Sequence, residues 1–406
     1  MNSNSDEHIP KVHDSERNKL GVHPEVIKLG FVSLLTDLSS EMIFAVFAVF
    51  FTTVAGASAA LLGVVEGCAD FSASSLNYFA GWLSDRTGKR KIFALAGYTF
   101  STLAKLILIV SSSVVGLSVF RVVERLGKSF RGPPRDAWLA AVADKQTRGY
   151  SFGVHKALDK TGAILGPLVA YGLLWWLGEG AATFRTLFWV ALIPALLSIV
   201  VLNRVNERAG KPHPRENLAH SWAILSPAFK RYLATAGIFS LAYFSYSFLL
   251  LRAHTLGFDV KEIVLLYALS NIACVLAAPL TGKLGDHIGR SRIILLSYLI
   301  YLLMSLGFAF ASSQWQIIVL FVVYGVFYSI DEAQSKAFIA DLEHERRASA
   351  IGMYNFVTGI IYLPASMIAG ALWLFHPAAA FIVAAFITSL AMASFVILRP
   401  DRYFHL

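Results

Sequence analysis

The sequence has few charged residues and few cysteines, and each shortage excludes a class of protein. Asp, Glu, Lys and Arg make up 15% of the 406 residues, whereas 56% are hydrophobic. Soluble domains carry about 25% charged residues, so the composition excludes an ordinary soluble protein and indicates an integral membrane protein. Both cysteines, Cys68 and Cys274, fall inside apolar segments, so no disulfide framework is expected.

Sequence motifs of enzyme and nucleotide chemistry are also missing. The sequence has no phosphate-binding GxxxxGK[ST] motif, no Cys/His cluster with metal-ligand spacing and no nucleophile motif. We therefore expect no enzyme activity, no ATP drive, no cofactor and no metal. The first 24 residues, MNSNSDEHIPKVHDSERNKLGVHP, lack the apolar core and cleavage site of a signal peptide. We expect them to form a cytoplasmic tail.

Long apolar runs are what the sequence has instead. A spanning helix needs roughly 20 apolar residues, and twelve segments qualify, beginning near Val26, Ala59, Ile92, Val114, Gly149, Thr183, Arg231, Val260, Ile293, Gln314, Ala348 and Ala378. They predict an all-α membrane protein with twelve transmembrane helices. Lys and Arg collect in alternate loops, as they do on the cytoplasmic side of membranes. The net charge of +9 therefore reflects the topology of a bacterial inner-membrane protein with both chain ends in the cytoplasm. It does not indicate a nucleic-acid partner.

The chain divides into two similar halves. The polar segment 203–220 separates six helices from six, so we expect a tail at 1–24, an N-terminal bundle at 25–203, a linker at 204–225 and a C-terminal bundle at 226–406. GWLSDRTGKRK at 81–91 is echoed by GKLGDHIGRSR at 282–292, and RDAWLAAV at 135–142 by SKAFIADL at 335–342. Parallel repeats of this kind occur in secondary transporters, whose substrate site lies where the halves meet.

The repeated motif resembles the loop 2–3 signature of the major facilitator superfamily. The matching residues of the first copy are Gly81, Asp85, Arg86, Gly88, Lys89 and Arg90, and the second copy keeps Gly282, Asp286, Gly289 and Arg290. In the second copy His287 replaces the first arginine. The resemblance covers residues 25–400. It implies two pseudo-symmetric six-helix bundles, alternating access, and a motif that latches the halves together in the outward-facing state.

A second segment favours export. GAILGPLVAYG at 162–172 resembles a glycine-proline signature of drug-type antiporters at Gly162, Gly166 and Pro167, although Ala170 and Tyr171 depart from it. Ordinary packing of small residues between helices is the alternative interpretation.

Charges inside the expected spans are the strongest functional signal, because a carboxylate at the bilayer centre costs roughly 2.5–3.5 kcal/mol on insertion scales. Asp37 and Glu41 lie one turn apart in the first span, and Arg121 and Arg125 lie one turn apart in the fourth. With a rise of about 1.5 Å per residue, Asp37 lies at the same depth in the membrane as Arg125, and Glu41 at the same depth as Arg121. We therefore expect these two pairs to face each other, as structural ion pairs or as a site for protons and substrate. By the resemblance, spans 1 and 4 line the cavity, and Arg121 holds the arginine position of the helix 4 signature.

Other charged and aromatic residues extend this candidate site. They are Glu124, Lys128 and Arg131 in the fourth span, Glu66 and Asp70 in the second, Tyr243 and Tyr246 in the seventh, and Asp331 and Glu332 in the tenth. By the repeat, Asp331 and Glu332 correspond to Arg131 and Gly132, and the opposite charges predict a cytoplasmic gate. Lys156 and Asp159, at the cytoplasmic end of the fifth span, are expected to form gate salt bridges.

The sequence therefore predicts a monomeric secondary active transporter in a lipid bilayer. The preferred function is export of a small polar or zwitterionic organic compound in exchange for protons, with Asp37 and Glu41 carrying the proton. One alternative is proton-coupled uptake of a nutrient or of a metal chelate such as a siderophore. A receptor-like protein without transport and a lipid flippase are further alternatives, but the dense charge within the spans favours transport.

Overall fold

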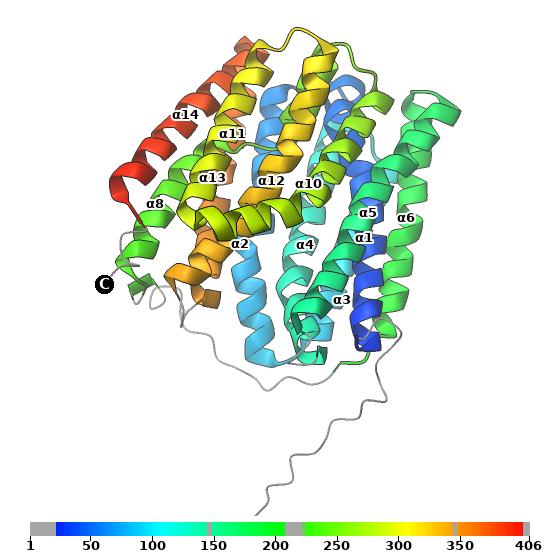
Figure 1. The fold of residues 1–406 in the computed structure, drawn as a ribbon. Coiled ribbons are helices and arrows are strands. Elements are labelled where there is room, and N and C mark those ends of the chain that lie inside the picture. The colour runs from blue at the N-terminus through cyan, green and yellow to red at the C-terminus, as the bar shows by residue number, and fades with distance from the viewer. Residues whose placement is uncertain (1–21, 144–147, 208–221, 224, 344–346, 401–406) are drawn as a thin grey trace, which may run out of the picture.

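The computed structural model describes residues 22–143, 148–207, 222–223, 225–343 and 347–400 (Figure 1). The tail expected at 1–24 and the linker expected at 204–225 lie mostly outside these residues. The first half contains α1 (Pro24–Val49) with the π-helical segment η2 (Phe50–Val54), α2 (Ala59–Thr87), α3 (Arg90–Val110), α4 (Val114–Val142), α5 (Arg148–Leu177) and α6 (Ala181–Asn203). The second half contains α8 (Pro227–Ala242), α9 (Ser247–Thr255), α10 (Val260–Ile288), α11 (Arg290–Phe310), α12 (Gln314–Leu342), α13 (Arg347–Phe375) and α14 (Pro377–Leu398).

The twelve predicted spans are confirmed in the described part of the chain, since α1 continues into η2 and α8 and α9 share one span. Ten of the spans are long and apolar enough to cross a membrane by composition alone. The exceptions are α4 and α5, which carry several charged side chains within their length. They are the helices whose polar side chains need an interior environment, because charges that face lipid are costly.

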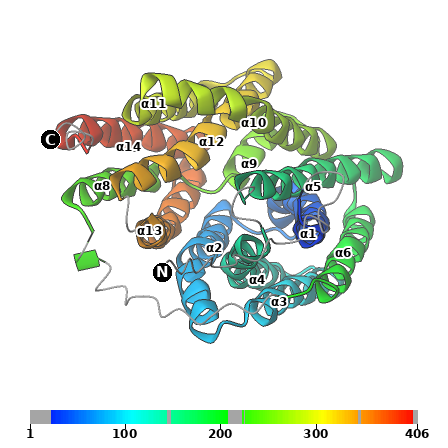
Figure 2. The same cartoon turned by 60° about the horizontal axis from the view of Figure 1, so that its bottom comes forward.

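Two helical bundles meet along one interface (Figure 2). Helices α1 to α6 gather on one side and α8 to α14 on the other, and the contacts between the halves are made chiefly by α2 with α13 and by α5 with α10. Glycine allows the first of these contacts to be close. A Cβ atom built on Gly63 would lie 2.3 Å from the carbonyl oxygen of Ser366, and one on Gly370 would lie 2.7 Å from that of Ala59.

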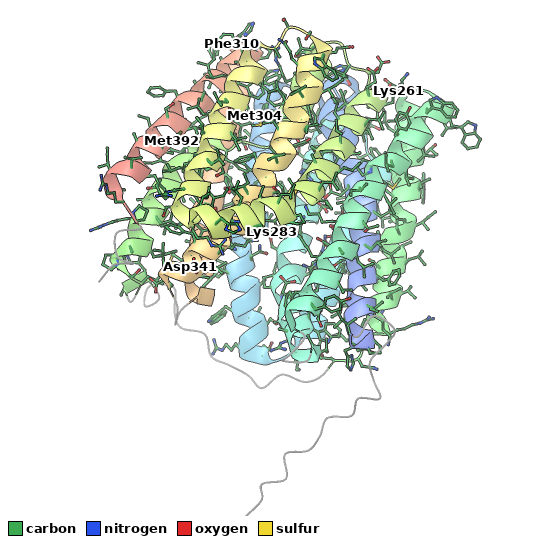
Figure 3. The ribbon with its side chains drawn as sticks, in the orientation of Figure 1. Lys261, Lys283, Met304, Phe310, Asp341 and Met392 are labelled. Atoms are coloured by element: carbon green, nitrogen blue, oxygen red, sulfur yellow. The ribbon has the colours of Figure 1, made fainter. Side chains whose placement is uncertain are left out.

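The outer surface of the bundle is apolar. Exposed large hydrophobic side chains include Val110, Trp175, Trp176, Phe310, Trp315 and Phe375, all near one end of the bundle. Figure 3 shows Phe310 and Lys261 at this end, with Asp341 toward the opposite one. We call the end at which α1 begins, where the Lys- and Arg-rich loops lie, the basic face, and the opposite end the distal face. Tryptophans at the end of an apolar belt are typical of the membrane–water boundary.

The seventh span is broken at residues 243–246. The amide of Ser245 donates to Ser366 Oγ at 3.1 Å, and Tyr301 Oη donates to the carbonyl oxygen of Ala242 at 2.8 Å. These side chains form hydrogen bonds with backbone groups that would have bonded each other in a continuous helix. Backbone groups inside a membrane need such partners, because no water is there to replace them. Broken helices at mid-depth are a feature of substrate sites in secondary transporters.

Candidate functional site

A cavity of 790 Å³ lies between the two halves. Its lining extends from the middle of the bundle to the basic face and is supplied by α1, α2, α4 and α5 from one half and by the α8–α9 break, α10, α12 and α13 from the other. At the basic face, the lining side chains of Asp136, Lys156 and Lys336 are 53%, 52% and 51% exposed. The cavity therefore opens on the basic face.

The distal face is closed over the cavity. Phe51, near the distal end of the first span, and Phe248, on the distal side of the break in the seventh, are completely buried, and α1 packs against α9 and α10. The Glu179 carboxylate, in the loop after α5, accepts the backbone amides of Val260 and Lys261 at 3.3 and 3.0 Å. It thus caps the N-terminus of α10, where the helix dipole favours an anion, and joins the two halves at the closed end.

The two halves line the cavity with different chemistry. The first half contributes charges, among which Asp37, Glu41, Asp70, Arg125, Lys128 and Arg131 lie deepest. The second half contributes a group of aromatic residues that we call the tyrosine cluster: Tyr243, Tyr246, Tyr267, Tyr324, Tyr328 and Tyr362. A cavity with one charged wall and one aromatic wall suits a ligand that has both a charged and an apolar part.

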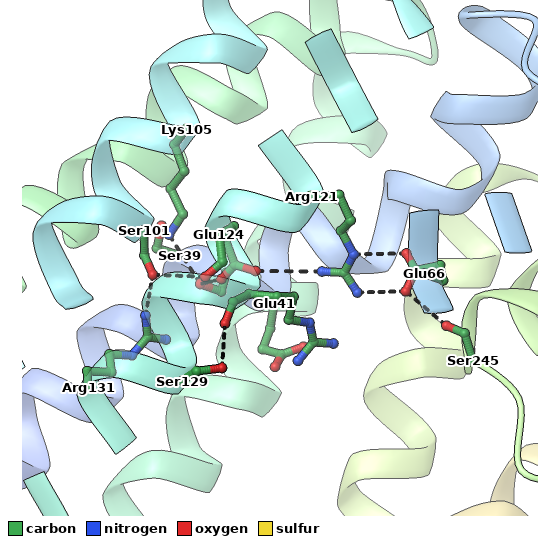
Figure 4. A network of polar contacts seen from close by, with 12 residues as sticks. Ser39, Glu41, Glu66, Ser101, Lys105, Arg121, Glu124, Ser129, Arg131 and Ser245 are labelled. Carbon is green, nitrogen blue, oxygen red and sulfur yellow. Dashed lines mark hydrogen bonds and ion pairs between the residues drawn. The ribbon is translucent and has the colours of Figure 1, made fainter. Parts of the chain in front are cut away.

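The expected pairing of α1 with α4 is wrong for Arg121, which binds Glu66 of α2 instead. Arg121 Nε lies 2.8 Å from Glu66 Oε1, and Arg121 Nη2 lies 2.9 Å from Glu66 Oε2 (Figure 4). Glu66 Oε2 also accepts a hydrogen bond of 2.9 Å from Ser245 Oγ, in the broken span of the other half. Both charges are buried behind the cavity wall. Buried charges require partners, and the contact between the two side chains together with the bond from Ser245 supplies them.

Glu124 belongs to the same buried layer, which also includes Lys105, a residue not among the predicted site residues. Glu124 Oε2 lies 3.7 Å from Arg121 Nη1, and Ser40 Oγ donates to Glu124 Oε1 at 3.1 Å. Lys105 of α3 is completely buried, and its Nζ donates to Ser39 Oγ at 2.5 Å and to Ser40 Oγ at 3.2 Å. Glu66, Arg121 and Glu124 are therefore not cavity-lining residues in this structure.

The remaining deep charges face the cavity and form no ion pair within the described residues. Asp37 and Arg125 both line the cavity, but the expected ion pair between them is not formed there. The spacing of α1 relative to α4 was therefore a misleading guide to both arginines.

Glu41 connects the halves through an aromatic residue. Tyr267 Oη of α10 donates a hydrogen bond to Glu41 Oε2 of α1. Tyr267 in turn packs against Phe44 and Tyr246, with ring centroids 5.4 and 5.1 Å apart. Tyr267 could not be identified from the sequence, because one tyrosine in an apolar run carries no signal of its own.

The predicted gate charges are located at the mouth of the cavity, with a different partner from the one expected. Lys156 Nζ of α5 lies 3.5 Å from Glu332 Oε1 of α12 and 3.3 Å from Asp159 Oδ2, so this ion pair crosses between the halves. Arg131 turns to its own half: its Nη1 donates to Ser101 Oγ at 2.5 Å, and its guanidinium lies 5.0 Å from the Tyr98 ring. Asp331 lines the cavity close to Ser335, whose Oγ is 3.5 Å away.

The two copies of the loop motif make contacts within their own halves. Gly88 ends α2 with a φ of 69°, and Arg90 Nη1 donates to the carbonyl oxygen of Ala137 at 2.8 Å. In the second copy Gly289 has a φ of 90°, and Arg290 Nη1 donates to Gln334 Oε1 at 2.6 Å. The side chains of Asp85 and Asp286 lie outside the described residues. Separate contacts for the two copies are consistent with an open basic face.

The other residues of the motif hold turn or surface positions. Arg86 lies with its guanidinium 5.2 Å from the Trp82 ring, and Lys89 precedes α3 as its N-cap without a side-chain hydrogen bond. Gly81 is buried, whereas a Cβ atom built on Gly282 would meet nothing within 4 Å.

The glycines of the segment 162–172 pack against α1. A Cβ atom on Gly162 would lie 2.3 Å from the carbonyl oxygen of Leu34, and one on Gly166 would lie 2.7 Å from that of Leu38. The close approach of α1 and α5 explains these glycines as packing residues and places α1, with Asp37 and Glu41, firmly in the cavity wall.

Comparisons with known proteins agree with this architecture. A family model described as Major Facilitator Superfamily matches residues 29–259 and 232–405. An uncharacterised MFS-type transporter of Methanocaldococcus jannaschii is 34% identical over 385 residues, which are 93% of this chain and 95% of the relative. The multidrug resistance protein MdtG of Serratia proteamaculans is 26% identical over 252 residues, which are 60% of each protein. The crystal structure of the nucleoside transporter NupG matches the fold with a TM-score of 0.74 at 12% identity, over 93% of this chain and 99% of that one.

Proposed function

The chain belongs to the major facilitator superfamily of membrane transporters, and on this basis we propose that it exports a small polar or zwitterionic organic compound in exchange for protons. The observation that carries the proposal is the pair of carboxylates in the cavity wall. Asp37 and Glu41 line the cavity between the halves, and Glu41 accepts a hydrogen bond from Tyr267 of the other half.

The proposed coupling follows from this hydrogen bond. A hydrogen bond to an ionised carboxylate is roughly twice as strong as one between neutral groups. Loading a proton on Glu41 therefore weakens its contact with Tyr267, and releasing the proton restores it. A proton bound in the cavity thus changes the free energy of a contact between the halves, which is what alternating access requires of a coupling site.

One comparison supports export, since the relatives include a protein named for multidrug resistance. The distribution of Lys and Arg supports a cytoplasmic basic face and two cytoplasmic chain ends, so the cavity would receive its substrate from the cell interior. We propose the bacterial inner membrane as the location and a monomer as the working unit.

The test is net accumulation of a panel of metabolites and antibiotics in cells that produce the wild type, Asp37→Asn or Asp259→Asn. Asp259 lies at the distal end of α10, outside the cavity, and is 61% exposed. We expect at least one compound to accumulate less in cells with the wild type and with Asp259→Asn, but not with Asp37→Asn. Greater accumulation with the wild type would reverse the direction. Equal accumulation of every compound in all three strains would contradict the proposal.

A further inference from the structure

The cavity contains a candidate subsite for one chemical class of ligand. Resting on the proposed transport function, we propose that Arg125 binds the oxyanion of an aromatic substrate, a carboxylate, phosphate or sulfonate, while the substrate's ring packs on Phe44, Tyr246 and Tyr267.

The charges of the cavity fall into a paired group and a deeper unpaired group. Near the mouth, Arg135 lies 2.9 Å from Asp136, Lys156 lies 3.3 Å from Asp159, and Glu332 is shared by Lys156 and Lys336. Farther in, Asp37, Asp70, Arg125 and Lys128 line the cavity without an ion pair to any described residue. The unpaired charges lie where the halves meet at mid-depth, which is where substrates of secondary transporters bind.

Arg125 differs from the other unpaired charges because one of its hydrogen-bond donors has no partner. Its Nε atom is buried and has no hydrogen-bond partner among the described residues. Arg121, one turn earlier on the same helix, donates hydrogen bonds from Nε and Nη2 to the Glu66 carboxylate. A buried donor without a partner is costly, so the planar guanidinium of Arg125 is prepared for the ligand that its fork fits best, a bidentate oxyanion.

The aromatic residues begin beside the same guanidinium. The Arg125 Cζ atom lies 5.7 Å from the centre of the Phe44 ring. The Phe44 centroid lies 5.4 Å from that of Tyr267 and 6.3 Å from that of Tyr246. An oxyanion held by Arg125 thus places the attached ring within reach of three aromatic faces or edges, and such contacts are worth more than the buried area alone.

Hydrogen bonds fix the aromatic side of the subsite. Tyr246 Oη and Ser270 Oγ lie 2.8 Å apart, and Tyr267 is held by Glu41. Tyr246 also packs edge-on against Tyr324 at 4.7 Å between centroids. Because these rings are held before a ligand arrives, little side-chain entropy is lost on binding.

The experiment measures ligand-induced thermal stabilisation of the purified protein in lipid nanodiscs, without a proton gradient. The probes are phenylacetate, phenyl phosphate and benzenesulfonate, with phenylacetamide as the neutral control and acetate and inorganic phosphate as the non-aromatic controls. The variants are Arg125→Gln, Arg125→Lys, Tyr246→Ala and Arg185→Gln. Arg185 lies outside the cavity, where its Nη2 contacts Ser112 Oγ at 3.3 Å.

We expect at least one aromatic anion to raise the Tm of the wild type and of Arg185→Gln, and the amide and the small anions to have no effect. Arg125→Gln should weaken the affinity for that anion about 10- to 100-fold, the loss of a hydrogen bond to a charged group. Arg125→Lys retains the charge but not the fork, and Tyr246→Ala removes one ring, so both should weaken binding by smaller factors. The anion that binds identifies the oxyanion class.

Three results would overturn the subsite: no stabilisation of the folded wild type by any aromatic anion, equal stabilisation by phenylacetamide, or unchanged affinity in folded Arg125→Gln. If Arg125→Gln does not fold, unchanged affinity in both Arg125→Lys and Tyr246→Ala has the same meaning. Because binding is measured without a gradient, these results are separate from a failure of proton coupling. That failure would appear as loss of gradient-dependent transport while the anion still binds.

Discussion

The guanidinium of Arg121 and the carboxylate of Glu66 form a two-pronged ion pair at 2.8 and 2.9 Å, with side chains that are only 4% and 0% exposed. Ser245 of the broken span adds a third hydrogen bond, 2.9 Å long, from the other half. This ion pair thus lies behind the cavity wall and joins α2 and α4 to the helix break. It supports the site, whereas Asp37, Glu41 and Arg125 face the cavity.

Removing one partner of this buried pair should destabilise the fold. Glu66→Ala leaves Arg121 buried without its carboxylate, and we expect the free energy of unfolding to fall by about 3–5 kcal/mol. Thermal unfolding in detergent measures the loss. Lys261→Ala is the matched control, because Lys261 is 39% exposed and its pair with Asp259 lies at the surface, where a change within about 0.5 kcal/mol is expected. A Tm of Glu66→Ala equal to that of the wild type would show that the pair does not stabilise the fold.

The close contact of α2 with α13 should not tolerate a side chain at Gly63. In Gly63→Ala the new methyl group meets the carbonyl oxygen of Ser366 at 2.3 Å, so the helices must move apart at a cost of about 1–3 kcal/mol. Gly172→Ala is the control, since a Cβ atom there meets nothing within 4 Å. Unfolding of both variants should show a lower Tm for Gly63→Ala alone. Equal Tm values would mean that the two halves are not closely packed at this point.

Glu179 should control the opening of the distal face. Its carboxylate caps α10 from the other half, and the loss of a helix cap costs about 0.5–2 kcal/mol. Glu179→Ala should therefore shift the equilibrium toward the distally open state by about 2- to 30-fold.

The readout is the rate at which a membrane-impermeant maleimide, added from the distal side, labels a cysteine introduced by Phe248→Cys. Phe248 is completely buried in the closed state. Faster labelling with Glu179→Ala than without it is expected, and Glu262→Ala, at the same end of α10, is the control. An unchanged rate would remove Glu179 from the distal closure.

The fold could be predicted from sequence because its signals are repeated and long. Apolar segments of about 20 residues locate each span within a few residues, and the duplicated motif at 81–91 and 282–292 separates the halves. The break at residues 243–246 was not predicted, because the segment remains apolar through it and its backbone groups are satisfied by Ser366 and Tyr301, which are distant in sequence.

The partners of the charges could not be predicted, because depth alone does not say which helices are neighbours. Glu66 lies seven residues after the start of α2, and Arg121 lies seven residues after the start of α4, so these two residues match in depth as well as Glu41 and Arg121 do. Helix α4 packs against α2 and α3 far more than against α1, which decides the pairing. Lys105 could have been found, since one lysine in an apolar span is as costly as the acids that were noticed.

The cavity carboxylates of Asp37 and Glu41 are proposed to couple proton movement to substrate movement. This coupling can be measured in everted membrane vesicles that hold a pH gradient, reported by a fluorescent dye, to which a compound found in the accumulation assay is added. We expect the compound to collapse the gradient in vesicles with wild type or Asp259→Asn and to leave it intact with Asp37→Asn. Collapse of the gradient with Asp37→Asn to the wild-type extent would exclude Asp37 from proton coupling.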